Sequence, residues 1–225
     1  MHYLLPMKLE STTNLLAILD DDKSVQIALQ DLIESAGMST LCFDSAEQFL
    51  LSGATRKAGC VIADIRMEGM SGLELQAKLK TERCRIPIIF ITGRGDISSA
   101  VKAMKEGASD FFTKPADGTA LLRSVERALQ QNIANRREDI EQARLVARYK
   151  YLTPREREVL PMVTSGLLNK QVAYELGISE CTVQLHRGNI MRKMEASSFA
   201  ALVRMADRVP LYLRHVQQLE FAAYS

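Results

Sequence analysis

Short apolar runs alternate with helix-like patterns over the first half of the chain. The runs cover residues 15–19, 39–43, 60–63, 87–91 and 110–113. Runs of this length, too short for a typical helix, are typical of buried strands. Between them, apolar residues recur every three or four positions, as they do along one face of a helix. Five strands alternating with helices predict a doubly wound α/β fold, with a five-stranded parallel sheet covered by helices on both faces.

Acidic residues follow two of these predicted strands. Asp20, Asp21 and Asp22 come directly after the first run, and Asp64 comes directly after the third. In doubly wound sheets, ligands bind beyond the carboxyl ends of the strands, where the strand order reverses. With the flavodoxin-like order 2-1-3-4-5, the first and third strands flank that point. These acids are therefore expected to meet at one edge of the sheet.

Two further polar residues end the remaining strands, Thr92 after the fourth and Lys114 after the fifth. Clustered carboxylates repel one another unless a cation lies among them, and oxygen ligands suit Mg²⁺. Asp64 can then act as a nucleophile on phosphorus, while Lys114 and Thr92 contact the transferred oxygens. Each residue alone could equally be a helix cap, a turn residue or a solvated charge. Their placement at consecutive strand ends favours a phosphoryl-transfer site.

From residue 151 onward the pattern is helical. Thr153 and Glu156 form a capping box at the start of a first helix, with a proline in the first turn. Asn169 is expected to cap a second, short helix, and Ser179 a third over residues 180–194. Two short helices joined across a glycine turn are typical of a helix-turn-helix arrangement.

The third predicted helix has one apolar side and one side without acids. Val183, Ile190 and Met194 lie on the inward side, while Glu180 and Glu195 stand only at the two ends. A solvated helix face would usually carry charges of both signs. The outward side, which lacks acids, therefore favours entry into the major groove of DNA.

The expected DNA contacts combine base readout with phosphate binding. Gly188 has no side chain to read a base, so Gln184, Leu185 and Asn189 are expected to carry readout. Basic side chains would reach phosphates, which position the protein without specifying sequence. The full set of expected DNA-binding residues is Lys170, Thr182, Gln184, Leu185, Gly188, Asn189, Arg192 and Lys193.

A single long helix is predicted over residues 117–150. Its first part carries a core-facing apolar stripe, and residues 136–139 are polar all round. The later part is either a solvated spacer or a helix that pairs with a second copy, because a lone exposed helix is marginal without packing.

Charge is distributed unevenly along the 225 residues. Residues 1–120 carry 13 Lys and Arg against 16 Asp and Glu, a net −3. Residues 121–150 carry 7 against 4, and residues 151–225 carry 9 against 7, so both segments are basic. This distribution indicates that only the second half meets a polyanion.

Other sequence features point to a protein of the cytoplasm. The four cysteines match no zinc-binding spacing, which fits a reducing compartment. No apolar run approaches the ~18 residues needed to span a bilayer. The N-terminal stretch is too short for a secretory signal. Residues 1–13 and 210–225 are expected to be terminal tails.

Residues 14–120 resemble the receiver domain of two-component response regulators. The resemblance implies that a histidine kinase phosphorylates Asp64. It implies that Asp20 and Asp21 hold Mg²⁺ with the backbone carbonyl of Arg66. It further implies that Thr92 and Phe111 form a coupled switch and that the Lys114–Pro115 bond is cis. The motifs that carry it are Ile18-Leu19-Asp20-Asp21-Asp22, Asp64-Ile65-Arg66-Met67, Ile91-Thr92-Gly93 and Phe111-Phe112-Thr113-Lys114-Pro115.

Residues 151–208 are similar to the LuxR/FixJ-type DNA-binding domain. The resemblance implies four helices, the fourth over residues 197–208, with a dimer face that includes Leu202, Val203 and Ala206. The motifs that carry it are Leu152-Thr153-Pro154-Arg155-Glu156, Leu176-Gly177-Ile178-Ser179, Thr182-Val183 and His186-Arg187.

The combined pattern predicts a DNA-binding transcriptional regulator switched by phosphorylation. We expect a receiver domain over residues 14–130, a helical linker over 131–150 and an all-α, four-helix DNA-binding domain over 151–209. Expected partners are a histidine kinase, promoter DNA, RNA polymerase and a second copy of the chain.

Two alternatives remain at this point. One is a phosphatase with an aspartyl intermediate, but such an enzyme needs an acid where Arg66 stands, so we expect no enzyme. The other is a regulator independent of phosphorylation, which Glu68 favours because the family usually has proline there.

Overall fold

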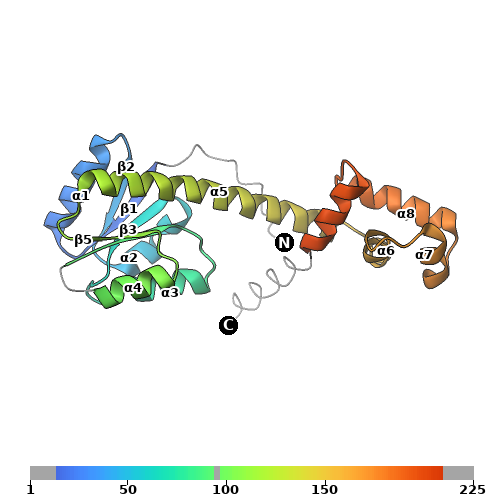
Figure 1. The fold of residues 1–225 in the computed structure, drawn as a ribbon, viewed down its shortest axis with the longest axis horizontal. Helices are drawn as coiled ribbons and strands as arrows, with labels where there is room; N and C mark the ends of the chain where they lie inside the picture. The colour runs from blue at the N-terminus through green and yellow to red at the C-terminus, as the bar shows by residue number, and fades with distance from the viewer. Residues whose placement is uncertain (1–13, 94–96, 210–225) are drawn as a thin grey trace. The chain divides into compact units, whose positions relative to one another are not determined.

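The computed structural model describes residues 14–93 and 97–209 (Figure 1). The chain divides between Arg136 and Arg137 into two compact units. Each unit has a hydrophobic core of its own, so the two are described separately. The tails predicted at residues 1–13 and 210–225 lie outside the described residues.

The first unit contains a five-stranded parallel sheet in the order β2-β1-β3-β4-β5. This confirms the predicted doubly wound fold and its strand order. The strands are β1 (Leu15–Leu19), β2 (Ser39–Phe43), β3 (Cys60–Asp64), β4 (Ile88–Thr92) and β5 (Asp110–Thr113).

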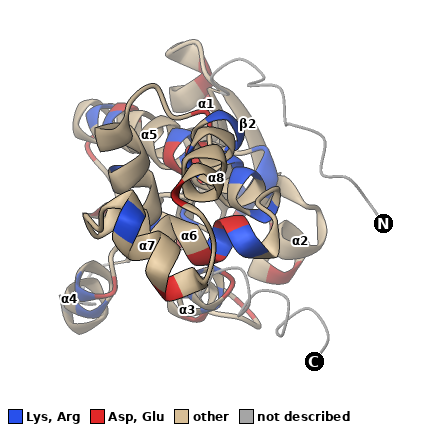
Figure 2. Cartoon of the chain, turned by 90° about the vertical axis from the view of Figure 1, so that its right-hand side faces the viewer, with Lys and Arg blue, Asp and Glu red and all other residues tan. Residues whose placement is uncertain are grey.

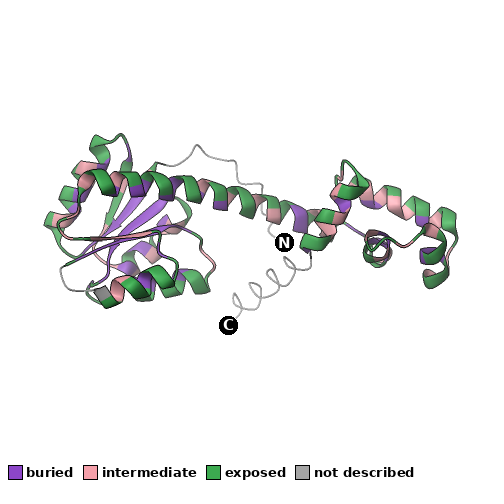
Figure 3. Cartoon of the chain, viewed as in Figure 1, coloured by how far each residue is buried: buried purple, intermediate pink, exposed green. Residues whose placement is uncertain are grey.

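Helices cover both faces of this sheet (Figure 1). Alternate residues of β1 point to opposite faces, so Leu16 and Ile18 belong to the hydrophobic core on one face, whereas Ala17 and Leu19 belong to the core on the other. The central strands β1, β3 and β4 are accordingly buried along almost their whole length, as Figure 3 shows for the centre of the sheet, whereas the edge strands β2 and β5 are exposed or half-buried. The helices are α1 (Lys23–Ser35), α2 (Ala46–Leu51), α3 (Gly72–Thr81), α4 (Ile97–Lys105) and α5 (Gly118–Lys150), with a short 3-10 turn η1 (Ala54–Arg56) after α2.

Two strands end one residue later than the apolar runs predicted. Asp64 pairs with Ile91 in the ladder between β3 and β4, and Thr92 pairs with Thr113 in the ladder between β4 and β5. Both polar residues are therefore the last residues of their strands rather than the first residues of loops. Backbone pairing with a neighbouring strand extended each strand beyond its apolar stretch.

Helix α5 contains residues of both units. Its first turns pack Leu121 and Val125 against the sheet, and its last turns bury Leu145 in the core of the second unit. Asn135 donates to the backbone carbonyl of Arg85 at 3.0 Å, which anchors the helix where the apolar stripe has ended. The predicted helix over 117–150 is thus present, beginning at Gly118.

The second unit contains α6 (Pro154–Thr164), α7 (Asn169–Leu176), α8 (Glu180–Lys193) and a further helix over residues 199–209. Its core brings together residues from all four helices and the end of α5. The buried members include Val159, Leu160, Val172, Val183, Ile190, Met194 and Leu202.

Two details of this unit differ from the sequence predictions. The N-cap of α7 is Leu168 rather than Asn169, because Gln171 supplies the side chain that bonds the Leu168 amide at 2.8 Å. Leu202 is 1% exposed and belongs to the unit's own core, so it cannot supply a dimer face. Val203 and Ala206 are only partly buried.

Candidate functional site

Three carboxylates meet at the carboxyl ends of β1 and β3. The two strands pair in parallel, which places Asp20 after β1 beside Asp64 at the end of β3. Asp20 is 1% exposed and Asp64 7% exposed, whereas Asp21 is exposed. One carboxylate oxygen from each residue lies within 4.8 Å of the others. Of the acids predicted to meet at this edge, Asp20, Asp21 and Asp64 do so, whereas Asp22 caps α1 through the Ser24 amide.

Lys114 connects two of these carboxylates. Its ammonium Nζ lies 2.6 Å from Oδ2 of Asp20 and 2.5 Å from Oδ2 of Asp64. The Lys114 backbone amide donates to the carbonyl of Thr92 at 2.7 Å, and the bond to Pro115 is cis, as the resemblance implied. The loop after β5 is thus tied to the end of β4, and this places the ammonium over the acids.

Burial and charge act in opposite directions on these groups. Burial raises the pKa of Asp20 above its usual value, and the Lys114 ammonium only partly offsets that rise. Burial alone would lower the pKa of Lys114, but its hydrogen bonds to Asp20 and Asp64 outweigh burial and raise that pKa. Lys114 is therefore held in its charged form.

Backbone amides hold the other oxygens of the two buried acids. The Asp22 amide donates to Oδ1 of Asp20 at 3.0 Å, and the Arg66 amide donates to Oδ1 of Asp64 at 2.9 Å. Each carboxylate thus has one oxygen toward the loop backbone and one toward Lys114. A compact set of oxygen ligands with excess negative charge is the donor set that a hard divalent cation requires.

The two residues expected to act as a switch lie on neighbouring strands. Thr92 is 1% exposed at the end of β4. Phe111 is half-buried on β5 and packs against the core on the α2, α3 and α4 face of the sheet. Glu68, the departure that favoured the alternative interpretation, is exposed on the loop after β3.

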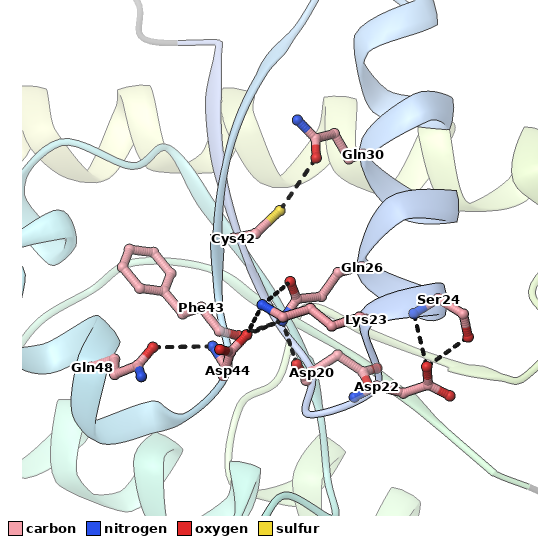
Figure 4. Close-up of polar contacts among 10 residues, drawn as sticks. All are labelled: Asp20, Asp22, Lys23, Ser24, Gln26, Gln30, Cys42, Phe43, Asp44 and Gln48. Atoms are coloured by element: carbon pink, nitrogen blue, oxygen red, sulfur yellow. Dashed lines mark hydrogen bonds and ion pairs between the residues drawn. The ribbon is translucent and has the colours of Figure 1, made fainter.

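The sequence interpretation missed one group beside this site. Gln26 of α1 is 3% exposed and contacts the ends of both β1 and β2 (Figure 4). A signal was present in the sequence, because Gln26 stands at helical spacing from Leu29 and Ile33 on the inward side of α1.

A second candidate site is the outward side of α8. Val183 and Ile190 are fully buried, whereas Gln184, Leu185 and Gly188 are exposed, as the helical pattern predicted. Thr182 and Asn189 lie half-buried at the edges of this side, and Lys170 on α7 and Arg192 on α8 are exposed.

Charges on α8 are arranged along its length. Its one acid, Glu180, stands in the first turn, and Arg192 and Lys193 stand in the last turn. Figure 2 colours the Lys and Arg residues of the chain blue and its Asp and Glu residues red.

Contacts within the second unit hold several of the expected DNA-binding side chains, Gln184 and Lys193 among them. Asn169 donates to Gln184 at 2.8 Å and accepts from Arg187 at 3.0 Å, and the Arg187 guanidinium lies over the ring of Phe199. Lys193 donates to the buried carboxylate of Glu156 at 2.7 Å. Lys193 therefore already has a partner, which a DNA phosphate would have to displace.

Over residues 14–93 and 97–209, no helix has the combination of length and apolar composition that crossing a bilayer requires.

Two family models match the chain. Residues 16–126 match the response regulator receiver domain, and residues 150–206 match bacterial regulatory proteins of the luxR family. The first match contains the carboxylate cluster, and the second contains α8.

Curated relatives align with most of the chain. Response regulator protein TodT of Pseudomonas putida is 49% identical over 192 residues, 85% of this chain and 85% of TodT. Transcriptional regulatory protein FixJ of Azorhizobium caulinodans is 41% identical over 189 residues, 84% of this chain and 90% of FixJ.

Solved structures are similar in fold as well. The response regulator StyR, at 44% identity, matches with a TM-score of 0.76 over 86% of this chain and 98% of StyR. Full-length FixJ from B. japonicum, at 38% identity, matches with a TM-score of 0.52 over 88% of this chain and 97% of FixJ. The chain therefore belongs to the two-component response regulators that join a receiver domain to a LuxR-type DNA-binding domain, transcriptional regulators that act with a partner histidine kinase.

Proposed function

We propose that Asp64 is the phosphoacceptor of this response regulator. The observation that carries the proposal is the position of the Lys114 ammonium, which bridges the buried carboxylates of Asp20 and Asp64. A lysine ammonium beside the attacking carboxylate oxygen can neutralise the negative charge of an incoming phosphoryl group. Thr92, at the end of the neighbouring strand, would donate its hydroxyl to another phosphoryl oxygen.

The proposed transfer uses a phosphohistidine of the partner kinase as donor. A carboxylate oxygen of Asp64 attacks phosphorus, the phosphorus–nitrogen bond breaks, and the imidazole nitrogen keeps the electron pair. The product is an acyl phosphate on Asp64, which adds about −1.5 to −2 charges at this edge of the sheet.

Asp20, Asp21 and Asp64 are the residues that would hold a divalent cation, together with the backbone carbonyl of Arg66. Their oxygen donors and excess negative charge favour Mg²⁺. When bound, the cation supplies charge neutralisation for the phosphoryl oxygens.

Phosphorylation would then change the outer face formed by α4, β5 and α5. Thr92 would move toward the phosphoryl group and Phe111 would rotate inward, which is the coupled change that the family resemblance implies. Val101 and Met104 are exposed apolar residues of α4. A second copy of the chain could bury them, so we propose homodimerisation on phosphorylation.

We propose that the protein acts on promoter DNA in the cytoplasm and contacts RNA polymerase there. Residues 14–130 would act as the receiver domain, 131–150 as the linker and 151–209 as the DNA-binding domain. Base readout would come from Gln184, Leu185 and Asn189. The proposed edge and phosphate contacts are Thr182, the Gly188 backbone, Lys170, Arg192 and Lys193.

The alternative is a regulator whose DNA binding does not depend on phosphorylation. Glu68 motivates it, since this acid follows the strand that carries Asp64. An aspartyl phosphatase is disfavoured because Arg66 stands two residues after Asp64, where such an enzyme needs an acid. We therefore propose no enzymatic turnover of a substrate.

Substitution of the proposed acceptor tests this function. Incubation with a small-molecule phosphodonor and Mg²⁺ should add one phosphoryl group to the wild-type chain, measured by intact-protein mass spectrometry. Asp64→Asn should add none, because the amide oxygen is a poor nucleophile. Asp31→Asn, which changes an exposed acid of α1, should react like the wild type. Phosphoryl transfer to Asp64→Asn at the wild-type rate would contradict the assignment.

DNA binding provides the second half of the test. Phosphorylated and unphosphorylated wild-type protein should differ in affinity for a DNA site selected from a random pool. Equal affinity of the two forms would favour the phosphorylation-independent alternative.

A further inference from the structure

Gln26 is a buried side chain that joins the ends of two strands beside the carboxylate cluster. Its amide nitrogen Nε2 lies 2.5 Å from the backbone carbonyl of Asp20 and 3.1 Å from that of Phe43. The same nitrogen lies 2.9 Å from Oδ1 of Asp44. Figure 4 shows the amide between the segment that follows β1 and the segment that follows β2.

The partners of Gln26 determine which way its amide points. All three groups around Nε2 are acceptors, and the Lys23 ammonium, a donor, faces Oε1 at 3.4 Å. The reversed amide would place its oxygen against three acceptors and its NH₂ group against a cation. Lys23 also forms an ion pair with Asp44, so the two charged groups hold the amide in one orientation.

These contacts fix the backbone of Asp20 from both sides. The Asp20 amide donates to the Phe43 carbonyl at 3.2 Å, and the Asp20 carbonyl accepts from Gln26. Rotation of either peptide group next to Asp20 would break one of these bonds. The direction of the Asp20 carboxylate therefore depends on a side chain that itself contributes no carboxylate to the cluster.

We propose that Gln26 is a positioning residue for the cation site, acting by orienting Asp20. The inference rests on the proposed function, since it assumes that Asp20 is a ligand of the divalent cation. Groups that orient a metal ligand by hydrogen bonds commonly change metal affinity 10- to 100-fold when they are removed. Gln26 bonds the backbone carbonyl of Asp20 rather than its carboxylate, so it orients this ligand through the main chain.

The test compares Mg²⁺ affinity in the full chain by isothermal titration calorimetry, with thermal unfolding measured in parallel. Gln26→Met keeps the length of the side chain but removes the amide, so Mg²⁺ should bind about 10-fold more weakly. Gln30→Met is the matched control. It lies one turn later on α1, bonds Glu34 and Cys42 instead, and should leave Mg²⁺ affinity unchanged.

A second variant covers the case in which Gln26→Met does not fold. Gln26→Asn keeps an amide in the same space but shortens the side chain by one methylene, so it cannot reach all three acceptors. It should also weaken Mg²⁺ binding, by a smaller factor than Gln26→Met.

The outcomes separate the inference from the function on which it rests. Wild-type Mg²⁺ affinity in a folded Gln26 variant would overturn the inference, even if the melting temperature fell, because Gln26 would then only stabilise the fold. An equal loss of affinity in Gln30→Met would overturn it too. Failure of the wild-type chain to bind Mg²⁺ would instead contradict the proposed cation site.

Discussion

Gly72 shows how closely the backbone packs behind Asp64, the proposed phosphoacceptor. It is the first residue of α3, its amide donates to the carbonyl of Ile65 at 3.0 Å, and it is buried. A β-carbon built on Gly72 would overlap the backbone oxygen of Asp64 and would lie 2.8 Å from the ring of Phe90. Only hydrogen fits there, because both neighbours belong to paired strands that cannot easily shift.

Replacement of Gly72 by alanine should therefore destabilise the receiver unit. Overpacking of this kind lowers the free energy of unfolding by about 1–3 kcal/mol. Urea denaturation of the variant and the wild type measures this difference. The displaced Asp64 backbone should also slow phosphorylation by a small-molecule donor.

Gly188→Ala provides the contrast within the same chain. Nothing lies within 4 Å of a β-carbon at Gly188, which stands inside α8. Alanine should stabilise the second unit by about 0.5–1 kcal/mol, the usual difference in helix propensity. Destabilisation by both substitutions to the same extent would contradict the steric argument.

At the scale of elements, a buried ion pair joins the start of α6 to the end of α8. Glu156 is 2% exposed, caps α6 through the Thr153 amide at 2.7 Å, and accepts from Lys193. The pair therefore connects α8 to α6, the first helix that lies wholly within the second unit. The capping box was readable from the sequence, but the partner on α8, 37 residues away, was not.

Removal of one partner should cost more than removal of both. Lys193→Met would leave Glu156 buried without its cation, and we expect a loss of about 2–3 kcal/mol, somewhat below the ~3–5 kcal/mol of fully buried pairs because Lys193 is partly exposed. Glu156→Gln with Lys193→Met should lose less, since no unpaired charge remains. A single variant that is no less stable than the double variant in urea denaturation would contradict this account.

The same pair predicts how the stability of the second unit changes with pH. Burial alone would raise the pKa of Glu156, but the hydrogen bonds from Lys193 and Thr153 outweigh burial and hold that pKa below its usual 4.5. The charged form is thus favoured by folding, so this contribution is present above pH 4.5 and is lost as pH falls through the lower pKa of the folded state.

The Lys193→Met variant lacks the ammonium that offsets the effect of burial on the pKa of Glu156. That pKa should rise, and the stabilisation of the wild type over the variant should shrink as pH falls below 4.5. Urea denaturation of both proteins across this pH range measures the difference. A difference in stability that does not change with pH would show that Glu156 is not the titrating group.

At the scale of the whole molecule, the proposed cation site and the proposed DNA-binding surface belong to different compact units. The carboxylates belong to the unit that ends at Arg136, and α8 belongs to the unit that begins at Arg137. Each unit has its own core, so a ligand of one unit need not stabilise the other.

Mg²⁺ should accordingly stabilise the first unit selectively. At a concentration 100 times its Kd, a ligand that binds only the folded state adds about 2.7 kcal/mol to the free energy of unfolding. Hydrogen exchange measured by mass spectrometry should show slower exchange for peptides of β1, β3 and β4, with little change for α6 and α8. Asp20→Asn should remove the effect, and equal protection of both units in the wild type would contradict the prediction.

Much of this protein is determined by local patterns in its sequence. Five apolar runs separated by amphipathic stretches predicted the sheet, since strands buried on both faces must be apolar along their whole length. The capping box formed by Thr153 and Glu156 placed the start of α6, because its two members lie only three residues apart. Asp20, Asp64 and Lys114 were identified because parallel strands bring their carboxyl ends to one edge.

The tertiary structure decided whatever depends on partners distant in sequence. Ladder pairing carried β3 and β4 one residue past their apolar runs, and packing placed Leu202 in the core rather than on a dimer face. Gln26 orients toward Asp20 only because β1 and β2 end side by side, and Lys193 meets Glu156 only because α6 packs on α8. Periodicity shows which side of an element is buried, but a hydrogen bond or an ion pair needs a specific neighbour, and only the folded chain supplies it.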